Sequence, residues 1–142
     1  FVSTFIGHSN LFYGTVRKKS VTSVEFADGY KIKMSNLENS VKDGQKVVIS
    51  VRPEEFSISK SGLKCKISNS TFLGKYTNYV LSFEDGMCIE NQPSIEFSQD
   101  LGHSDHIYSS GNDIYLEPNS EKINVFTEDM QRSLIKEVKR FA

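Results

Sequence analysis

The 142-residue sequence has no tryptophan, only two cysteines and three prolines, and no excess of basic residues. Cys65 and Cys88 cannot form the disulfide framework of a small secreted domain, so we expect two reduced thiols on strands. The formal net charge of −1 leaves no basic field to hold nucleic acid phosphates or anionic lipid. No apolar run approaches the roughly 20 residues of a transmembrane helix.

Motifs for nucleotide hydrolysis and for nucleophilic catalysis are also missing. The phosphate loop G-x-x-x-x-G-K-[ST] does not occur, because Gly74-Lys75 lacks the earlier glycine and the following Ser or Thr. There is no G-x-S-x-G elbow and no C-x-x-C pair. We therefore predict that this chain is not an enzyme by itself, and that it binds no cofactor.

Short strand patterns fill most of the sequence. Runs rich in Val, Ile, Phe, Tyr and Thr alternate with turn signals, and Asp28-Gly29 and Asp85-Gly86 are typical of tight hairpins. Close spacing of many strands predicts an all-β barrel or sandwich. The expected strands are Leu11–Lys18, Val21–Ala27, Tyr30–Met34, Lys46–Arg52, Phe56–Ser59, Leu63–Thr71, Tyr76–Phe83, Met87–Glu90, Asp113–Glu117 and Lys122–Phe126.

Two segments depart from this pattern. Residues 91–111 are polar, contain Pro93 and lack sustained alternation, so we expect a long loop. Residues 127–142 are expected to form a helix, with Thr127 as its cap and acidic residues in its first turn. Its apolar stripe would be formed by Met130, Leu134, Ile135 and Val138.

A weak internal repeat divides the chain into halves of about 1–60 and 61–126. Three landmarks recur in the same order: FIG and FLG, DGYKI and DGMCI, GQKVVI and GNDIYL. The first and third are offset by 67 residues and the second by 57, which indicates different insertions in the two halves. We expect two small repeated β units.

Metal and acid–base candidates are few. His103, Asp105 and His106 are weak metal candidates, and a fourth ligand would have to come from His8, a cysteine or water. Glu54 and Glu55 are adjacent carboxylates, but neighbours on an extended chain point to opposite faces and do not naturally share a proton. We expect no metal and no catalytic pair.

The stretch VVISVRPEEF ends a run of alternating apolar residues in Arg52, Pro53 and Glu54. Proline fixes φ and removes a ladder donor, so Pro53 should end the strand. Arg52 is then held at a rigid strand end, where its guanidinium can pair with Glu54 or with a carboxylate across an interface. We interpret these residues as a structural corner with interface potential.

Four segments together resemble a known family. They are FIGHSNLFYGTV, VRPEEFSI, FLGKYTNYVLSF and Val125-Phe126, in that order over about 125 residues. The chain is similar to the TOBE (transport-associated, oligomer-binding) domain that follows the nucleotide-binding domain in ATP-binding subunits of ABC importers for polyamines, ferric iron or sugars. The matching positions include Asn10 in the first motif, Arg52, Pro53 and Glu54 in the second, and Gly74 in the third.

The resemblance implies an oligonucleotide-binding-like β-barrel with interleaved halves over residues 1–126. It implies an accessory and regulatory role in ATPase-subunit dimerisation and in solute or regulator sensing, at the cytoplasmic face of the membrane. The implied partners are an upstream ATPase domain, a second subunit and membrane permease subunits, with ATP and Mg²⁺ bound outside this chain. Because the sequence begins at Phe1, we expect a fragment whose ATPase domain lies upstream.

Two alternatives remain from the residues alone. A small-ligand β-barrel that binds an oxyanion or a metal is one. A single-stranded nucleic-acid binder is the other, because Tyr30 and Tyr76 each stand beside a lysine on a strand and could stack on bases.

Overall fold

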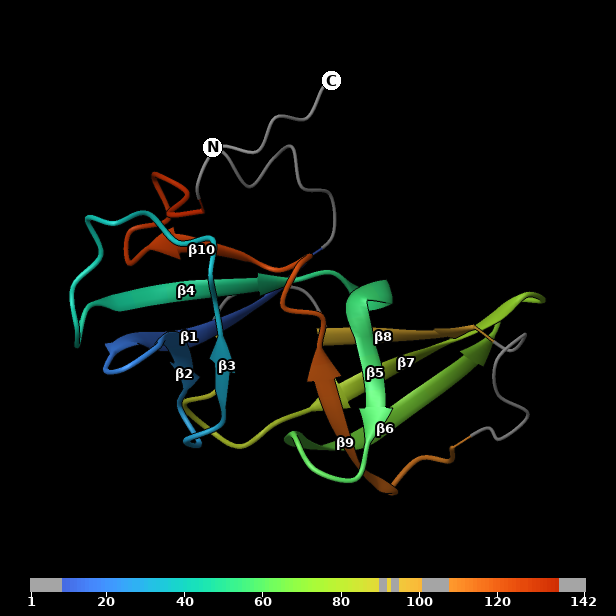
Figure 1. Ribbon diagram of the computed structural model, residues 1–142. Coiled ribbons are helices and arrows are strands. Elements are labelled where there is room, and N and C mark those ends of the chain that lie inside the picture. Colours follow the sequence, from blue (N-terminus) through green and yellow to red (C-terminus); the bar gives the residue numbers. More distant parts are fainter. Residues whose placement is uncertain (1–8, 90–91, 93–94, 101–107, 136–142) are drawn as a thin grey trace.

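The computed structural model describes residues 9–89, 92, 95–100 and 108–135. These residues form two five-stranded antiparallel sheets that lie side by side in Figure 1, and their only helical element is a single 3-10 turn. The all-β prediction is confirmed, and the arrangement is consistent with an oligonucleotide-binding-like fold. Among these residues no helix is long and apolar enough to cross a membrane.

The first sheet has the order β10-β4-β1-β2-β3 and the second has the order β5-β9-β6-β7-β8. The chain exchanges strands between them, because β5 follows β4 but pairs with β9, and β10 follows β9 but pairs with β4. The first sheet contains β10 (Asn124–Thr127), β4 (Lys46–Val51), β1 (Asn10–Lys18), β2 (Thr22–Phe26) and β3 (Lys31–Lys33). The second contains β5 (Phe56–Ser59), β9 (Asp113–Pro118), β6 (Leu63–Phe72), β7 (Tyr76–Ser82) and β8 (Ile95–Asp100).

Strand order is the same in both sheets, because β4-β1-β2-β3 corresponds to β9-β6-β7-β8. Similar strand order can arise without a duplicated sequence, so the sequence repeat stays a prediction. The exchange of β5 and β10 has a direct consequence, however. Each sheet contains one strand from the other half of the chain, β10 in the first sheet and β5 in the second, so neither sheet is complete without the other half.

Nine of the ten expected strands are present, and burial alternates along β1 and β9 as the sequence pattern predicts, whereas Val47–Val51 of β4 are all buried. In β9, for example, Ile114, Leu116 and Pro118 are buried while Asp113, Tyr115 and Glu117 are exposed. Gly29 and Gly86 have φ values of 96° and 90°, which suits glycine in the tight turns that Asp-Gly predicted.

The expected loop over residues 91–111 is wrong in part, because β8 lies within it. Ile95, Phe97 and Gln99 point inward along this strand and are buried. The inward glutamine interrupts the apolar alternation, and the Tyr79 hydroxyl compensates by donating a 2.8 Å hydrogen bond to its Oε1. Conversely, the expected strand at Met87–Glu90 appears only as one bridge, between Cys88 and Phe12, with Glu90 outside the described residues.

The predicted C-terminal helix is wrong over residues 127–135; residues 136–142 lie outside the described part of the chain. Thr127 ends β10, and its hydroxyl donates to Asp129 Oδ1 at 2.6 Å. Asp129 Oδ1 also accepts from the Gln131 amide at 3.1 Å. The side chains that suit a helix cap also suit a turn, and here they close a turn that reverses the chain onto β10.

The returning segment, Ser133–Ile135, adds to the first sheet. Leu134 is buried in the common core, its amide donates to the Val125 carbonyl at 2.7 Å, and its carbonyl accepts from the Glu38 amide at 2.8 Å. Two further bridges join Phe126 to Ser133 and Leu37 to Ile135. Leu134, part of the apolar stripe, is therefore covered by this chain's own sheets.

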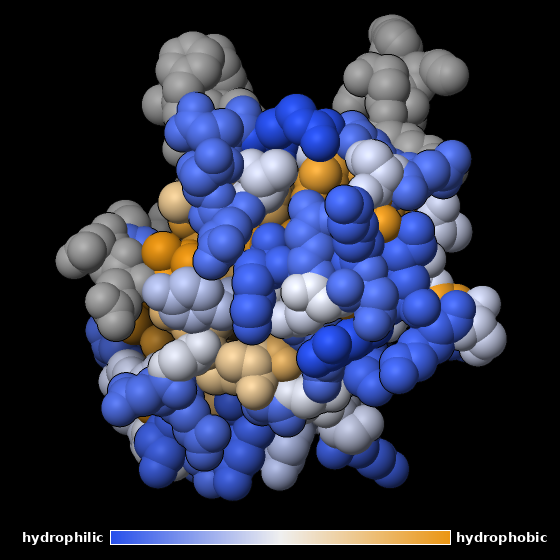
Figure 2. Space-filling view, turned by 90° about the vertical axis from the view of Figure 1, so that its left-hand side faces the viewer, coloured by the Kyte–Doolittle hydropathy of each residue, from blue (hydrophilic) through white to orange (hydrophobic). Residues whose placement is uncertain are grey.

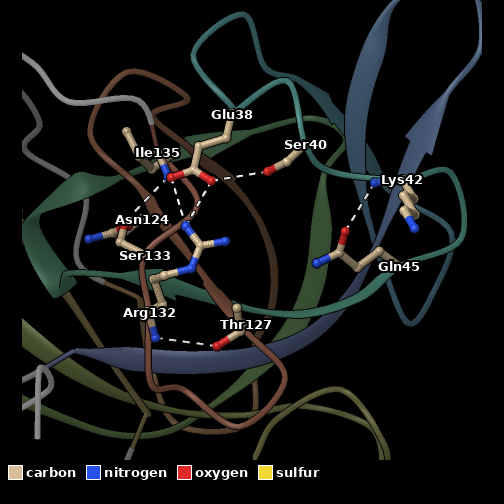
Figure 3. Close-up of polar contacts among 9 residues, drawn as sticks. All are labelled: Glu38, Ser40, Lys42, Gln45, Asn124, Thr127, Arg132, Ser133 and Ile135. Atoms are coloured by element: carbon tan, nitrogen blue, oxygen red, sulfur yellow. Dashed lines mark hydrogen bonds and ion pairs between the residues drawn. The ribbon is translucent and has the colours of Figure 1, made fainter.

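An ion pair fastens the same segment. The Arg132 guanidinium points at the Glu38 carboxylate, and its Nη1 donates to both carboxylate oxygens at 2.8 Å (Figure 3). Arg132, with a smaller contribution from the Ser40 hydroxyl, lowers the pKa of the Glu38 carboxyl below its ordinary value.

This pKa shift predicts a pH dependence. A lowered carboxyl pKa in the folded chain stabilises the fold above the unfolded-state value of about 4.3, and that contribution disappears as pH falls through the lowered pKa. The melting temperature of the wild-type chain should exceed that of Glu38→Gln at pH 7, and the difference should shrink steadily below about pH 4.3. Melting curves of both proteins from pH 3 to 7 check this; a difference that is constant with pH would contradict it.

One hydrophobic core serves both sheets. Phe12 is fully buried, and its ring meets those of Phe26, Phe56 and Phe83 edge-on, at centroid distances of 5.5, 6.2 and 5.2 Å. Because Phe26 belongs to the first sheet and Phe56 to the second, Phe12 joins the two. By contrast, the end of the molecule at the left of Figure 1 is mostly hydrophilic, with only small hydrophobic areas (Figure 2).

Candidate functional site

The first and second sequence motifs meet at the junction between the sheets. Asn10 begins β1, stands opposite Val51 at the end of β4, and is fully buried. Its side-chain Nδ2 donates to the Glu96 carbonyl at 2.7 Å, and its Oδ1 accepts from the Glu96 amide at 2.9 Å. The side-chain amide of Asn10 thus pairs with the edge of β8 as a peptide group of a neighbouring strand would.

Gln92 also pairs its side-chain amide with a main chain, in this case that of Leu11 near the start of β1. Its Oε1 accepts from the Leu11 amide at 3.0 Å, and its Nε2 donates to the carbonyls of Leu11 at 2.9 Å and Ile89 at 2.6 Å. Sequence analysis missed Gln92 because a lone glutamine in a polar segment gives no local signal of a partner 81 residues away. Together, Asn10 and Gln92 bind the start of β1 to the segment that leads into β8.

The corner at Arg52, Pro53 and Glu54 follows directly. Strand β4 ends at Val51, and the 3-10 turn η2 (Pro53–Glu55) begins with the buried Pro53 and lies against β8. Arg52 Nη1 is 4.0 Å from Glu54 Oε2, and both side chains are at least half exposed. The main chain, with the Glu55 amide donating to the Arg52 carbonyl at 2.9 Å, shapes this corner more than the ion pair does.

Replacement of Arg52 by alanine should therefore have little effect on stability. An exposed ion pair at 4.0 Å contributes roughly 0–1 kcal/mol, and truncation of a surface side chain changes stability by about 0.5 kcal/mol or less. We expect Arg52→Ala and Lys42→Ala, a change of an exposed lysine, to unfold at nearly the same urea concentration. A loss above about 2 kcal/mol in Arg52→Ala alone would show that Arg52 has a buried partner absent from this geometry.

The third motif lies far from this junction, at the tip of the β6–β7 hairpin. Gly74 has a φ of 92°, which favours glycine, although a side chain there would meet no atom within 4 Å. Beside it, Phe72 is 62% exposed, Leu73 49% and Tyr76 42%. The structure therefore brings Asn10 and the Arg52–Glu54 corner together on β8 and leaves Gly74 apart from them.

No cluster of three or more metal-ligating side chains occurs among the residues that the structure describes. The metal candidates His103, Asp105 and His106, with His8, lie outside those residues. Cys65, on β6, and Cys88 are both free, and burial raises the pKa of each thiol to about 12. Both thiols are therefore protonated at neutral pH, which makes them poor nucleophiles and poor metal ligands.

A family model of the TOBE domain matches residues 49–126, from the middle of β4 through η2 and the second sheet to Phe126 in β10. The chain belongs to the TOBE domain family. The match covers more than half of the chain and includes the corner, β8 and the hairpin of Gly74. It confirms the resemblance drawn from the sequence motifs.

Curated relatives of this TOBE domain include two proteins with the name Fe(3+) ions import ATP-binding protein FbpC. The one from Fusobacterium nucleatum is 36% identical over 142 residues, which cover 97% of this chain and 35% of that protein. The one from Pasteurella multocida is 26% identical over 71% of this chain and 29% of that protein. The spermidine/putrescine import ATP-binding protein PotA from Nostoc is 32% identical over 63% of this chain and 26% of that protein. The chain thus spans about a quarter to a third of the relatives it matches.

Proposed function

We propose that this TOBE domain is the accessory and regulatory part of an ABC-importer ATP-binding subunit. The observation that carries the proposal is the alignment of 97% of the chain with about a third of an import ATP-binding protein. ATP hydrolysis would belong to a further domain, because the sequence has no phosphate loop. ATP and Mg²⁺ would bind to that domain, and this chain would hold no cofactor of its own.

Within such a subunit, the domain would contribute to dimerisation and respond to a solute or a regulatory protein. The apolar tip around Gly74 supports a contact role, because Phe72 and Leu73 are large hydrophobic side chains exposed to solvent. The partners would be the ATPase domain, a second subunit and the membrane permease subunits. The domain would then lie at the cytoplasmic face of a membrane, attached peripherally through those partners.

The experiment is a comparison of the chain with the full product of its gene. The proposal predicts that this product is a longer protein that contains G-x-x-x-x-G-K-[ST] and hydrolyses ATP, while the 142-residue chain should hydrolyse none. In sedimentation, the longer protein should dimerise more weakly when Phe72 and Leu73 are both changed to Ser. A gene without a phosphate loop would contradict the importer assignment, whereas unchanged dimerisation would contradict only the contact role.

A further inference from the structure

The charged residues of this chain are divided unequally along its length. Residues 9–52, which supply four of the five strands of the first sheet, contain eight lysines and arginines and four acidic residues. Residues 53–135 contain six lysines and arginines and thirteen acidic residues. The net charge of −1 therefore averages over a basic part and an acidic part, and each can attract a partner of opposite charge.

The basic part contains a groove of about 360 Å³ between the turn that joins β1 to β2 and the connection from β3 to β4. Both of these segments lie at the left of Figure 1. Met34 and Leu37 line the groove and are almost completely buried, while Val21, which also lines it, is 49% exposed. The groove therefore offers an apolar seat at a mostly hydrophilic end of the molecule.

Lysines surround this groove. Lys33 of β3 lines it, and the Lys18 Nζ donates to two carbonyls of the β3–β4 connection at 2.9 and 3.5 Å. These bonds hold the β1–β2 turn, with Lys19, against the connection that contains Lys42. The ion pairs of the described residues do not engage Lys19, Lys33 or Lys42, so their ammonium groups are free to bind a partner.

The acidic side chains near the groove do not cancel this charge. Glu38 lines the groove, but its carboxylate already accepts both bonds from the Arg132 guanidinium at 2.8 Å. Asp43 is held on the other side of the β1–β2 turn, where its Oδ1 accepts from the Lys18 amide at 2.8 Å. One unpaired carboxylate against four lysines leaves the rim of the groove positive.

We propose that this basic groove binds an acidic segment of a partner protein, with an aliphatic side chain of that segment packed against Val21. The lysines come from the β1–β2 turn, from β3 and from the β3–β4 connection. Such a spread matches carboxylates placed along an extended segment better than it matches one small anion. The groove is then the site for the regulatory protein of the proposed function, and this assignment rests on that proposal.

Two other anionic partners fit the groove less well. Nucleic-acid bases stack on exposed aromatic rings, and none of the described lining residues is aromatic. An anionic membrane surface would need several exposed apolar side chains, whereas Val21 is the one exposed large hydrophobic residue in the described lining. An acidic protein segment needs only the lysines and one apolar seat.

The primary test is an NMR titration of the 142-residue chain with acetyl-Glu-Asp-Leu-Glu-Asp-amide. The amide signals of Thr22 and Ser35, which line the groove, should shift and saturate as peptide is added. A peptide with Gln and Asn in place of Glu and Asp should cause no saturable shift, and one with Ser in place of Leu should bind several-fold more weakly. Raising the salt to about 0.3 M should also weaken binding, because exposed charges are then screened.

Matched variants locate the binding. Lys33→Glu should weaken binding of the acidic peptide by roughly threefold to tenfold, because one attraction becomes a repulsion. Lys60→Glu makes the same change at an exposed lysine between β5 and β6 and should leave binding unchanged. Lys19→Glu, outside any strand, is the second test where Lys33→Glu lowers the melting temperature. Val21→Ser should bind the Leu and Ser peptides equally, because the apolar contact is then lost with both.

Several results would overturn the proposal. One is the absence of a saturable shift at millimolar peptide, and another is equal weakening by Lys33→Glu and Lys60→Glu. Shifts at Thr22 and Ser35 that grow with protein concentration alone would mean that the acidic part of a second copy occupies the groove. Tighter binding of oligothymidylate or of phosphatidylglycerol vesicles would assign the groove to nucleic acid or to a membrane. Each result leaves ATP hydrolysis by the longer protein, which tests the importer assignment, unaffected.

Discussion

Replacing Phe12 with alanine should lower the free energy of unfolding by about 3–5 kcal/mol, the largest loss expected from any single truncation here. Phe12 is fully buried, and its ring contacts aromatic rings from both sheets, so no neighbouring element can close the cavity alone. At roughly 2–4 °C per kcal/mol for a chain of this size, the melting temperature should fall by about 6–20 °C. Urea denaturation followed by circular dichroism measures this loss.

The matched control for Phe12 is Phe72→Ala. The same side chain is removed, but Phe72 is 62% exposed at the hairpin tip, so we expect a change within about 0.5 kcal/mol. Equal losses in the two variants would mean that the sheets do not share the core around Phe12.

Replacing Asn10 with alanine should cost about 2–4 kcal/mol. The variant loses two hydrogen bonds from the Asn10 side chain to the Glu96 main chain, and removal of one partner of such a bond costs about 1–3 kcal/mol. Hydrogen exchange should also accelerate at the Glu96 amide more than at amides of β2. This local readout distinguishes loss of the junction from general destabilisation.

Asn69→Ala is the control for Asn10, because Asn69 is an exposed asparagine on β6. It should change stability by no more than about 0.5 kcal/mol. If Asn10→Ala proves as stable as Asn69→Ala, the amide pair with Glu96 does not hold the sheets together.

The failures of sequence analysis have a common physical origin. Sequence analysis missed β8 because the inward-facing Gln99 interrupts its apolar alternation. The residue that satisfies Gln99 in the core, Tyr79, lies 20 residues away in sequence. Thr127 and Asp129 indicated a helix because the same side chains cap helices and close turns. In both cases the local pattern was compatible with two structures, and contacts distant in sequence selected one.

The candidate junction was found only in part. Motifs marked Asn10 and Arg52–Glu54, but no sequence pattern indicated that Asn10 pairs with Glu96, 86 residues away. The sequence favoured Arg52 as a rigid pairing group, whereas the structure gives an exposed contact at 4.0 Å and assigns the buried role to Pro53. Side-chain exposure depends on what packs above the corner, and here that element is β8, which the sequence did not reveal.

By itself, the sequence determined the all-β class, nine strands, the Asp-Gly turns, the family and the absence of a phosphate loop. These properties depend on alternation, turn chemistry and motifs within a few consecutive residues. The tertiary structure alone decided that β5 and β10 exchange sheets and that Ser133–Ile135 returns to β10. It also decided that the side-chain amide of Asn10 pairs with the main chain of β8. Each of these depends on which strand edge remains unpaired once the core has formed, and no local stretch of sequence specifies that.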